Sequence, residues 1–450
     1  MLPDSPLHTR CGTQGVGGVK FGSAFAQTLV SQLLQSSASI VTGVLIARGL
    51  GPAGQGWYAT FAAGVGLGAF LASLGQFHGN VLAVASSGVS PRLLVGRSVA
   101  HGIAVLAVSS ALILLWHRFI APAAPAFVFS VFAVVLTLES VAEMVRGINL
   151  GQHHVTAWNV VSLTQRFVYC AAVVLLFVTL RLRLELVVVG WALATFASVV
   201  ASIVWVWRRT SAHSLRLSDI WQGWGARLGT GLRAFVTVGL TLLLVRADVW
   251  MLRPMLGVTT VGQISVATYL AEWLWYVPSI LGNLIFAVVA ADAGAETLRK
   301  VTRSARMMAL LMTCVLLVLL PAGRMVVRLL YGDAYAEAGL LFVILLPGMA
   351  ALAIHLIVDS YFAGRGFPPI TIWGAFCALV AKVGLNIVVV PRFGAFGAAG
   401  VTSVVYMGLL ALKVIWFRRT TGTRLPALLI LDRSDCAYIA RTIGFARAVE

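Results

Sequence analysis

Three cations lie well inside apolar runs of the chain, where ionisable side chains are costly: Arg166, Arg246 and Lys382. A Lys or Arg at the centre of a membrane span costs about 2.5–3.5 kcal/mol on insertion scales, so each should face protein or a water-filled cavity. In a cavity such cations bind phosphate groups, and Arg does so with two parallel hydrogen bonds. The alternative is a structural role, in which each cation pairs with a carboxylate on a neighbouring span.

Polar side chains accompany two of these cations. Asn159, Arg166 and Tyr169 share one helical face with Ser162, because their spacing is i, i+3, i+7 and i+10. Asn386 lies one turn from Lys382 and extends its polar face. The two stripes predict cavity-lining faces that flank a central cleft.

Aromatic and acidic side chains share one side of a later apolar run, at Tyr269, Glu272 and Trp273. Aromatic rings beside a carboxylate suit the faces and hydroxyls of a sugar. Trp and Tyr are also common anchors at the membrane surface. Both interpretations stay open.

The carboxylates of these runs are candidates for binding a coupling ion. Asp248 follows Arg246 by two residues, so the two side chains point about 200° apart and cannot simply pair. We expect Arg246 to face the cleft, and Asp248 to face a neighbouring helix or a coupling cation. His355 and Asp359 are one turn apart, which fits a proton relay on a wet face or a buried hydrogen bond on a dry one.

Glu139 is a further coupling-ion candidate. It shares a helical face with Glu143 and Arg146, at i, i+4 and i+7. A local ion pair between Glu143 and Arg146 is the expected arrangement.

No metal or cofactor site is predicted. The five cysteines form no CxxC motif, so they predict neither a zinc site nor a disulfide framework. The neighbouring residues His153 and His154 point in different directions on a helix, and no carboxylate lies at ligand spacing.

The elements that position these residues must be membrane spans. The 450 residues are 60% hydrophobic and 11% charged, with a mean hydropathy of +0.94. This composition indicates an all-α polytopic membrane protein. The net charge of +18 is scattered between the apolar runs, which excludes a nucleic-acid-binding surface.

Twelve spans are predicted. They cover roughly residues 23–47, 57–86, 93–116, 120–145, 155–180, 185–207, 230–254, 262–290, 304–328, 339–362, 368–390 and 395–417. Lys and Arg gather in every second connector, so the positive-inside rule predicts that both termini are cytoplasmic. The organisation is then a tail (1–22), a lobe of spans 1–6 (23–207), a basic connector (208–229), a lobe of spans 7–12 (230–417) and a second tail (418–450).

The two predicted lobes carry traces of an internal repeat. "LGPAGQGWYA" (50–59) after span 1 is similar to "LGVTTVGQISVA" (256–267) after span 7, at an offset of about 206 to 208 residues. Gly151 after span 4 and Gly366 after span 10 are a second pair of corresponding positions, 215 residues apart. Two six-helix lobes related by a pseudo-two-fold axis along the membrane normal are expected, with substrate between them near the midplane.

Four segments resemble the polysaccharide-biosynthesis flippases, of the type that moves O-antigen units, in the multidrug/oligosaccharidyl-lipid/polysaccharide (MOP) exporter superfamily. The resemblance covers most of residues 21–417. The segments are "IARGLGPAGQGWYA" (46–59), "RADVWMLRPMLGVTTVGQISVATYLAE" (246–272), "LLYGDAYAEAGLLFVILLPG" (329–348) and "VVVPRFGAFGAAGVTS" (388–403).

The resemblance implies alternating access across the bacterial cytoplasmic membrane. It further implies a polyprenyl-diphosphate-linked oligosaccharide as substrate, moved to the outer leaflet for surface polysaccharide biosynthesis. Arg166, Arg246 and Lys382 would hold the diphosphate, and Arg48 would guard the outer end. Membrane lipids and the polysaccharide polymerase and export machinery are the implied partners, and an H⁺ or Na⁺ gradient or the membrane potential is the implied energy source.

An exporter of drugs or other small cations, similar to the MATE transporters and coupled to a cation, is the second reading. Such a transporter would favour an acidic cavity. A membrane glycan polymerase would need a sizeable outer loop, which the predicted spans do not leave.

Overall fold

A computed structural model describes residues 18–87, 89–119, 126–152, 155–210, 232–291, 294–366 and 368–423, and in these ranges the chain is helical. Predictions for the first tail up to residue 17, for His153 and His154, for residues 211–231 of the connector region and for the tail from residue 424 lie outside the described residues. The helices are α1 (Gly18–Ser73), α2 (Gln76–Ser87), α3 (Pro91–Phe119), α4 (Ala126–Gly151), α5 (Val155–Val178), α6 (Leu184–Arg209), α9 (Leu232–Leu256), α10 (Val258–Ala271), α11 (Tyr276–Ala291), α12 (Ala295–Tyr331), α13 (Ala336–Gly364) and α14 (Pro369–Thr421), with short 3₁₀ helices η1 (Glu272–Trp275) and η2 (Asp333–Tyr335).

Eight stretches of the described chain are long and apolar enough to cross a membrane. Three of them are far longer than the roughly 20 residues that one crossing needs, and each bends at a glycine with positive φ. These glycines are Gly51 (φ 66°) in α1, Gly257 (φ 81°) between α9 and α10, and Gly394 (φ 56°) in α14. Each of these three stretches therefore holds two spans, so the eight stretches hold eleven. The described part of the twelfth predicted span, 120–145, lies in α4, and the predicted span 57–86 is interrupted at Leu74 and Gly75, between α1 and α2.

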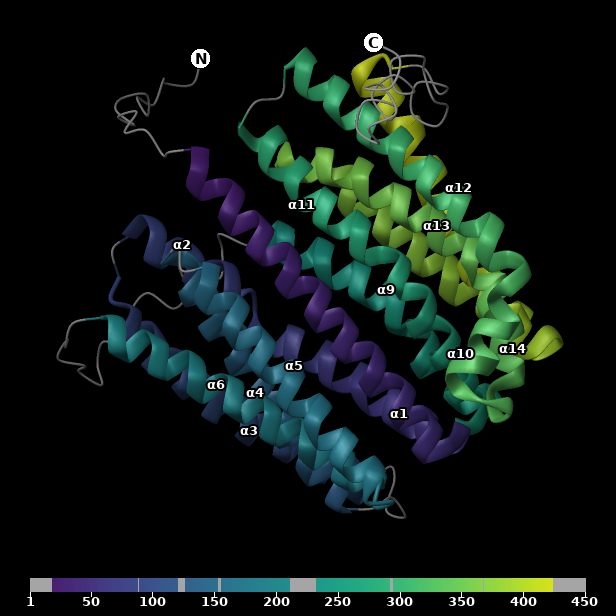
Figure 1. Ribbon diagram of the computed structural model, residues 1–450, viewed down its shortest axis with the longest axis horizontal. Helices are drawn as coiled ribbons and strands as arrows, with labels where there is room; N and C mark the ends of the chain where they lie inside the picture. The colour runs from purple at the N-terminus through teal and green to yellow at the C-terminus, as the bar shows by residue number, and fades with distance from the viewer. Residues whose placement is uncertain are drawn as a thin grey trace, which may run out of the picture.

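The helices form two lobes, α1–α6 and α9–α14, and α1 runs along the boundary between them (Figure 1). Hydrophobic cores lie within the first lobe, around Val145 and Ile46, and within the second, around Met308. The core around Leu346 belongs mainly to the second lobe and includes Ala47 and Ala63 of α1. The start of α1 and the end of α14 lie at the same end of the molecule, as an even number of spans requires. We call this end the termini side and the opposite end the distal side.

The repeat is visible where the lobes cross on the distal side. A Cβ atom on Gly56 would lie 1.9 Å from the carbonyl oxygen of Val258, and one on Gly262 would lie 1.8 Å from that of Pro52. The contact is reciprocal, and each residue matches its counterpart at an offset of 206. The sequence similarity allowed offsets of 206 to 208 residues, and the reciprocal contact corresponds to 206. Glycine is required at both positions, because only glycine lets the two backbones approach so closely.

Span 8 is interrupted at η1, between α10 and α11. Pro278, four residues after Leu274, has no N–H to donate to the Leu274 carbonyl, so one hydrogen bond of a regular α-helix is missing here. The tighter 3₁₀ turn places Glu272 and Trp273 at the interior of the molecule.

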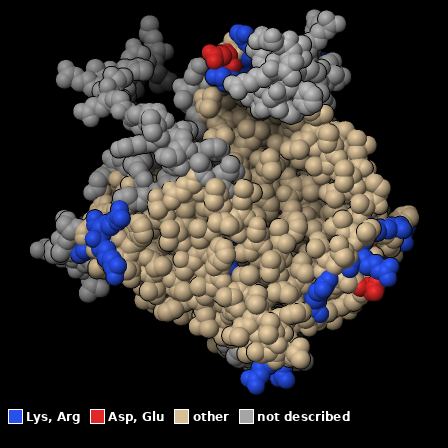
Figure 2. All heavy atoms as spheres, in the orientation of Figure 1, with Lys and Arg blue, Asp and Glu red and all other residues tan. Residues whose placement is uncertain are grey.

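The surface fits a bilayer. Figure 2 shows a broad face nearly free of charged side chains, with Lys and Arg gathered at its margins. Large apolar side chains such as Leu114, Leu317 and Val318 are mostly exposed on the lobes. In water such a surface would be unstable, whereas in hydrocarbon it is the expected one.

Candidate functional site

A cavity of about 340 Å³, which we call the central cleft, lies between the lobes. Helices α1, α5 and α6 form one wall, and α9, α10, η1, the start of α11 and the end of α12 form the other. Its charged lining residues are Arg166, Arg246 and Glu272. Its aromatic lining residues are Tyr58, Tyr169, Trp191, Tyr269, Trp273, Tyr276 and Tyr331. The predicted cleft residues on span 8, Tyr269, Glu272 and Trp273, therefore do line it.

Arg166 is the cation of the cleft that has no carboxylate partner among the described residues. Its side chain is exposed in the cleft, beside Tyr169, whose hydroxyl donates a hydrogen bond of 3.1 Å to the hydroxyl of Tyr58. Only part of the polar stripe predicted on span 5 lines the cleft, namely Arg166 and Tyr169. Asn159 is buried and donates to Oγ1 of Thr28 on α1 (3.2 Å), so it joins two helices of the first lobe and does not line the cleft.

Arg246 faces the cleft, as predicted, but a carboxylate neutralises it. Its guanidinium makes two hydrogen bonds to Glu272, of 2.7 and 3.1 Å, and lies 5.4 Å from the ring centre of Tyr269. The pair connects α9 to η1. Sequence spacing could not reveal it, since the two residues lie on different helical segments, 26 positions apart.

Lys382 does not line the cleft, which corrects the prediction that it flanks the substrate path. It is 0% exposed inside the second lobe, and its Nζ lies 2.6 Å from Oδ2 of Asp248 and 2.8 Å from the carbonyl oxygen of Leu244. Asn386, also predicted to line the cleft, is buried and donates to Oδ1 of Asp248 (3.1 Å), and Thr402 donates to Oδ2 (3.0 Å).

Asp248 is accordingly turned to a neighbouring helix, α14, and away from Arg246, as the i, i+2 spacing predicted. The partner of its carboxylate is the ammonium of Lys382. The structural alternative, a cation paired with a carboxylate on a neighbouring span, is the arrangement that Lys382 adopts.

Arg48 belongs to the contact between the lobes on the distal side. Its Nε and Nη2 donate to the carbonyl oxygens of Leu330 (2.7 Å) and Leu329 (2.6 Å), at the end of α12. A cation there also complements the negative end of the helix dipole. Its guanidinium is therefore engaged with the backbone of the other lobe, and its predicted role of guarding the outer end stays a prediction.

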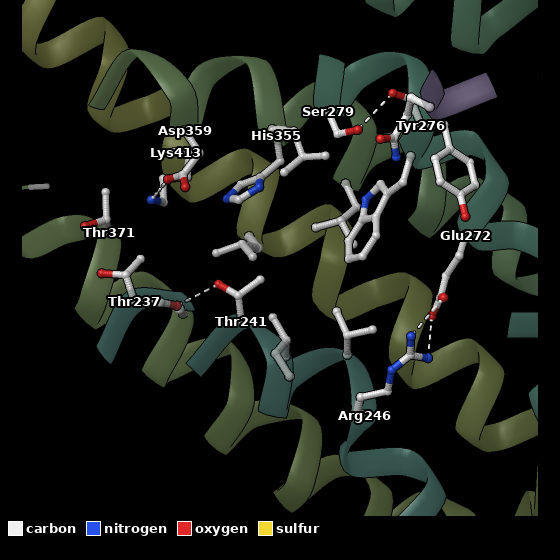
Figure 3. Close-up of a pocket in the computed structure, with 18 residues that line it drawn as sticks. Thr237, Thr241, Arg246, Glu272, Tyr276, Ser279, His355, Asp359, Thr371 and Lys413 are labelled. Carbon is white, nitrogen blue, oxygen red and sulfur yellow. Dashed lines mark hydrogen bonds and ion pairs between the residues drawn. The ribbon is translucent and has the colours of Figure 1, made fainter. Parts of the chain in front are cut away.

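A second cavity, of about 390 Å³, lies in the second lobe beside the cleft (Figure 3). We call it the second-lobe pocket. Asp359 and Lys413 form an ion pair at one end, and the Arg246–Glu272 pair lies at the other. His355 lies between them, one turn from Asp359 on α13, and is 6% exposed. The predicted neighbours His355 and Asp359 thus share a cavity, while the partner role of Lys413 was missed.

Glu139 lies one layer behind the cleft, in the first lobe. It accepts hydrogen bonds from Trp191 Nε1 (2.8 Å), Gln165 Nε2 (2.7 Å) and Thr195 Oγ1 (2.9 Å). The predicted local pair between Arg146 and Glu143 is present, at 2.8 Å. Glu139 therefore orients Trp191 and Gln165, which themselves line the cleft.

Metal ligands do not gather in the described part of the chain. No group of three His, Cys, Asp or Glu residues there could hold a metal ion. Cys170, Cys314 and Cys377 are free thiols.

Solved structures with the same arrangement of helices are transporters. An inward-facing MATE-family multidrug resistance transporter of the MOP superfamily aligns with a TM-score of 0.67 and 15% identity, over 87% of this chain and 98% of that one. The chain has the MATE fold. A MOP-superfamily transporter from Pyrococcus furiosus (TM-score 0.64, 14% identity, 88% and 95% covered) and the eukaryotic MATE transporter AtDTX14 (0.60, 13%, 88% and 96%) share this MATE fold. No protein-family model matches the sequence, and no curated protein matches it significantly.

Proposed function

We propose that the protein is a membrane transporter that moves a polyprenyl-diphosphate-linked oligosaccharide from the cytoplasmic to the outer leaflet of the bacterial cytoplasmic membrane, for surface polysaccharide biosynthesis. One observation carries the proposal. The central cleft holds an arginine, Arg166, that is paired with no carboxylate of the described residues, and aromatic side chains line the same cleft.

The charges of the cleft favour an anionic substrate. Arg246 and Glu272 cancel each other, so Arg166 leaves the lining with a net positive charge. A guanidinium binds phosphate oxygens with paired, charge-assisted hydrogen bonds, and it does so more strongly in a cavity shielded from water. The aromatic lining offers flat apolar faces and hydroxyls to the sugars of the head group.

Transport by alternating access requires the lobes to separate on one side at a time. In this structure the distal side is closed by the crossing of Gly56 and Gly262, by Arg48, and by Tyr335, whose hydroxyl donates to the carbonyl oxygen of Ala47 (2.8 Å). With both termini in the cytoplasm, as the charge distribution predicts, the distal side is the outer side. The closed state is then the one that loads substrate from the cytoplasm.

Within this proposal, fewer residues than the sequence suggested are candidates for binding a coupling ion. Asp248 is buried with Lys382 and is not among the residues that line either cavity. A coupling H⁺ or Na⁺ would therefore act at His355, Asp359 or Glu272, which line the cavities, or through Glu139 behind them. The membrane potential, acting on the charges in the cleft, is the other source. Polymerase and export proteins would receive the product.

The second candidate is a MATE-like exporter of small cations coupled to an ion gradient, because fold neighbours include a multidrug resistance transporter. A cationic drug needs an available carboxylate, whereas Glu272 and Asp359 are both paired with cations here. For the transporter from Pyrococcus furiosus, a reversed polarity of the binding pocket is said to suggest a different function. The unpaired charge of the present cleft is positive, which favours the lipid-linked anion.

The test uses purified protein in liposomes with a fluorescent polyprenyl-diphosphate-linked trisaccharide, whose leaflet is read by a membrane-impermeant quencher. We expect Arg166→Ala to slow movement tenfold or more, since a charge-assisted hydrogen bond contributes about 1.5–3 kcal/mol. Arg166→Lys should retain part of the rate. Arg181→Ala, at an exposed arginine after α5, should match the native protein.

The competing exporter predicts the opposite pattern. If the native protein leaves the lipid-linked trisaccharide in place but moves cationic dyes, and Asp359→Ala abolishes the dye transport, the flippase assignment is wrong. In cells, deletion of the gene should cause a lipid-linked glycan to accumulate on the cytoplasmic leaflet.

A further inference from the structure

The second-lobe pocket is lined by residues with buried polar atoms that have no hydrogen-bond partner in the described part of the chain. Nδ1 and Nε2 of His355 and Nε1 of Trp275 are all in this state, and both residues line the pocket. Buried polar groups are nearly always hydrogen-bonded, because leaving one unpaired costs about 1–3 kcal/mol. The imidazole can donate one hydrogen bond and accept another, and the indole can only donate. The pocket thus suits a ligand rich in groups that both donate and accept.

Hydroxyl side chains add acceptors to the same lining. Thr241 donates to the carbonyl oxygen of Thr237 (2.9 Å), Ser279 to that of Tyr276 (2.8 Å), and Thr371 to that of Pro368 (2.8 Å). Each hydroxyl hydrogen is used within its own helix, so the oxygen lone pairs remain for a hydroxyl or amide of a ligand. Figure 3 shows His355, Thr241 and Ser279 around the same hollow.

The charges of the pocket cancel. Its cations, Arg246 and Lys413, are each paired with a carboxylate, Glu272 and Asp359. Such a lining offers no free charge to a phosphate or to an ammonium group. A volume of about 390 Å³ lies in the range of small-ligand sites, and Trp275 and Tyr276 supply aromatic surface.

Three residues, Arg246, Glu272 and Tyr276, line both this pocket and the central cleft. The two cavities are therefore adjacent, and the Arg246–Glu272 pair lines both. We propose that the second-lobe pocket binds an uncharged sugar of the lipid-linked glycan while Arg166 in the cleft holds the diphosphate. This inference rests on the proposed function and specifies its substrate class more closely. The substrate is a lipid-linked glycan whose sugar farthest from the diphosphate is uncharged.

The experiment compares two probes on the full-length protein in detergent, farnesyl diphosphate and the same diphosphate carrying a neutral trisaccharide. The trisaccharide should tighten binding by about tenfold. Trp275→Phe removes the indole N–H and keeps an aromatic ring, and Thr371→Val replaces the hydroxyl by a methyl group. Each variant should bind the trisaccharide-bearing probe about five- to tenfold more weakly than the native protein does. Neither should change the affinity for farnesyl diphosphate. Trp373→Phe, at an exposed tryptophan on α14, and Thr313→Val, on α12, are the matched controls.

Equal affinity of the native protein for both probes, or equal losses in the pocket and control variants, would overturn the sugar site. Free neutral trisaccharide is the third probe. If it binds and Trp275→Phe weakens it, while farnesyl diphosphate does not bind at all, the sugar site stands and the proposed flippase function fails. If farnesyl diphosphate binds but neither the trisaccharide nor its lipid-linked form gains from the pocket, the function stands and the sugar site fails.

Discussion

Arg166 and Lys382 occupy corresponding spans of the two lobes but have opposite environments, and the difference has a local cause. Lys382 reaches Asp248 on span 7. At the offset of 206 that the glycine crossing defines, the counterpart of Asp248 on span 1 is Thr42, which lines the cleft. The first lobe therefore offers no carboxylate at this position, and Arg166 remains available to a substrate.

The buried pair of Lys382 and Asp248 should contribute to stability and not to substrate binding. Lys382→Ala or Asp248→Ala leaves one buried charge alone, which costs about 3–5 kcal/mol of unfolding free energy. The double variant Lys382→Met/Asp248→Asn should recover most of that loss. Denaturant unfolding in detergent measures the effect.

The exposed pair of Arg328 and Asp333 is the control, because both side chains are more than two-thirds exposed and Arg328→Ala should cost no more than about 1 kcal/mol. A Lys382→Ala protein with unchanged stability and no transport would instead support a place for Lys382 on the substrate path.

Sequence reasoning found the costly residues but not their partners. Arg166, Arg246, Lys382 and Asp248 stand out because a charge inside an apolar run needs an explanation. Which of them face the cleft depends on the rotation and packing of helices far apart in the chain. The sequence did not predict that Tyr58 and Trp191 line the cleft, since an aromatic residue in a span usually packs against neighbouring helices.

Glycines fix the geometry of the elements on the distal side. Gly51 and Gly257 adopt positive φ where spans 1 and 2 and spans 7 and 8 meet, and Gly56 and Gly262 let these bends cross backbone to backbone. The spans themselves could be predicted, because apolar length is a strong signal. The break at Leu74 and Gly75 within the predicted span 57–86 was missed, since both residues are compatible with an apolar helix by composition.

The glycine crossing predicts two matched variants. Gly56→Ala and Gly262→Ala should each destabilise the protein strongly and to a similar degree, because the new methyl group would overlap a backbone carbonyl that cannot rotate away. Gly408→Ala on α14, with nothing within 4 Å of the added Cβ, should be neutral or slightly stabilising. Melting temperatures in detergent provide the comparison. Unchanged melting of both crossing variants would show that the lobes do not meet there.

At the scale of the whole molecule, the distal side is held shut by a few contacts between lobes. The guanidinium of Arg253 lies 3.9 Å from the ring centre of Trp57, next to the glycine crossing. The two-lobe architecture could be predicted from the repeat and the spans. The conformation could not, because the same sequence must support both access states.

Cross-linking tests the proposed alternation. In a protein whose native cysteines are replaced, Trp57→Cys with Arg253→Cys should let a short, reducible cross-linker join the lobes on the distal side. Transport of the lipid-linked trisaccharide should then stop, and reduction should restore it. Arg328→Cys with Asp333→Cys joins residues of the second lobe only, so the same treatment should leave transport intact. Full transport with the lobes linked would exclude this opening.

The pairing of Asp248 with Lys382 also bears on how the chain is made. Span 7 is synthesised with its carboxylate before span 11 exists, and three further spans must follow before the ammonium arrives. Until then the nascent lobe carries a lone charge that hydrocarbon disfavours by about 2.5–3.5 kcal/mol. A chain truncated before span 11 keeps that charge unpaired, so we expect the unfinished lobe to be less stable in the membrane than the completed one.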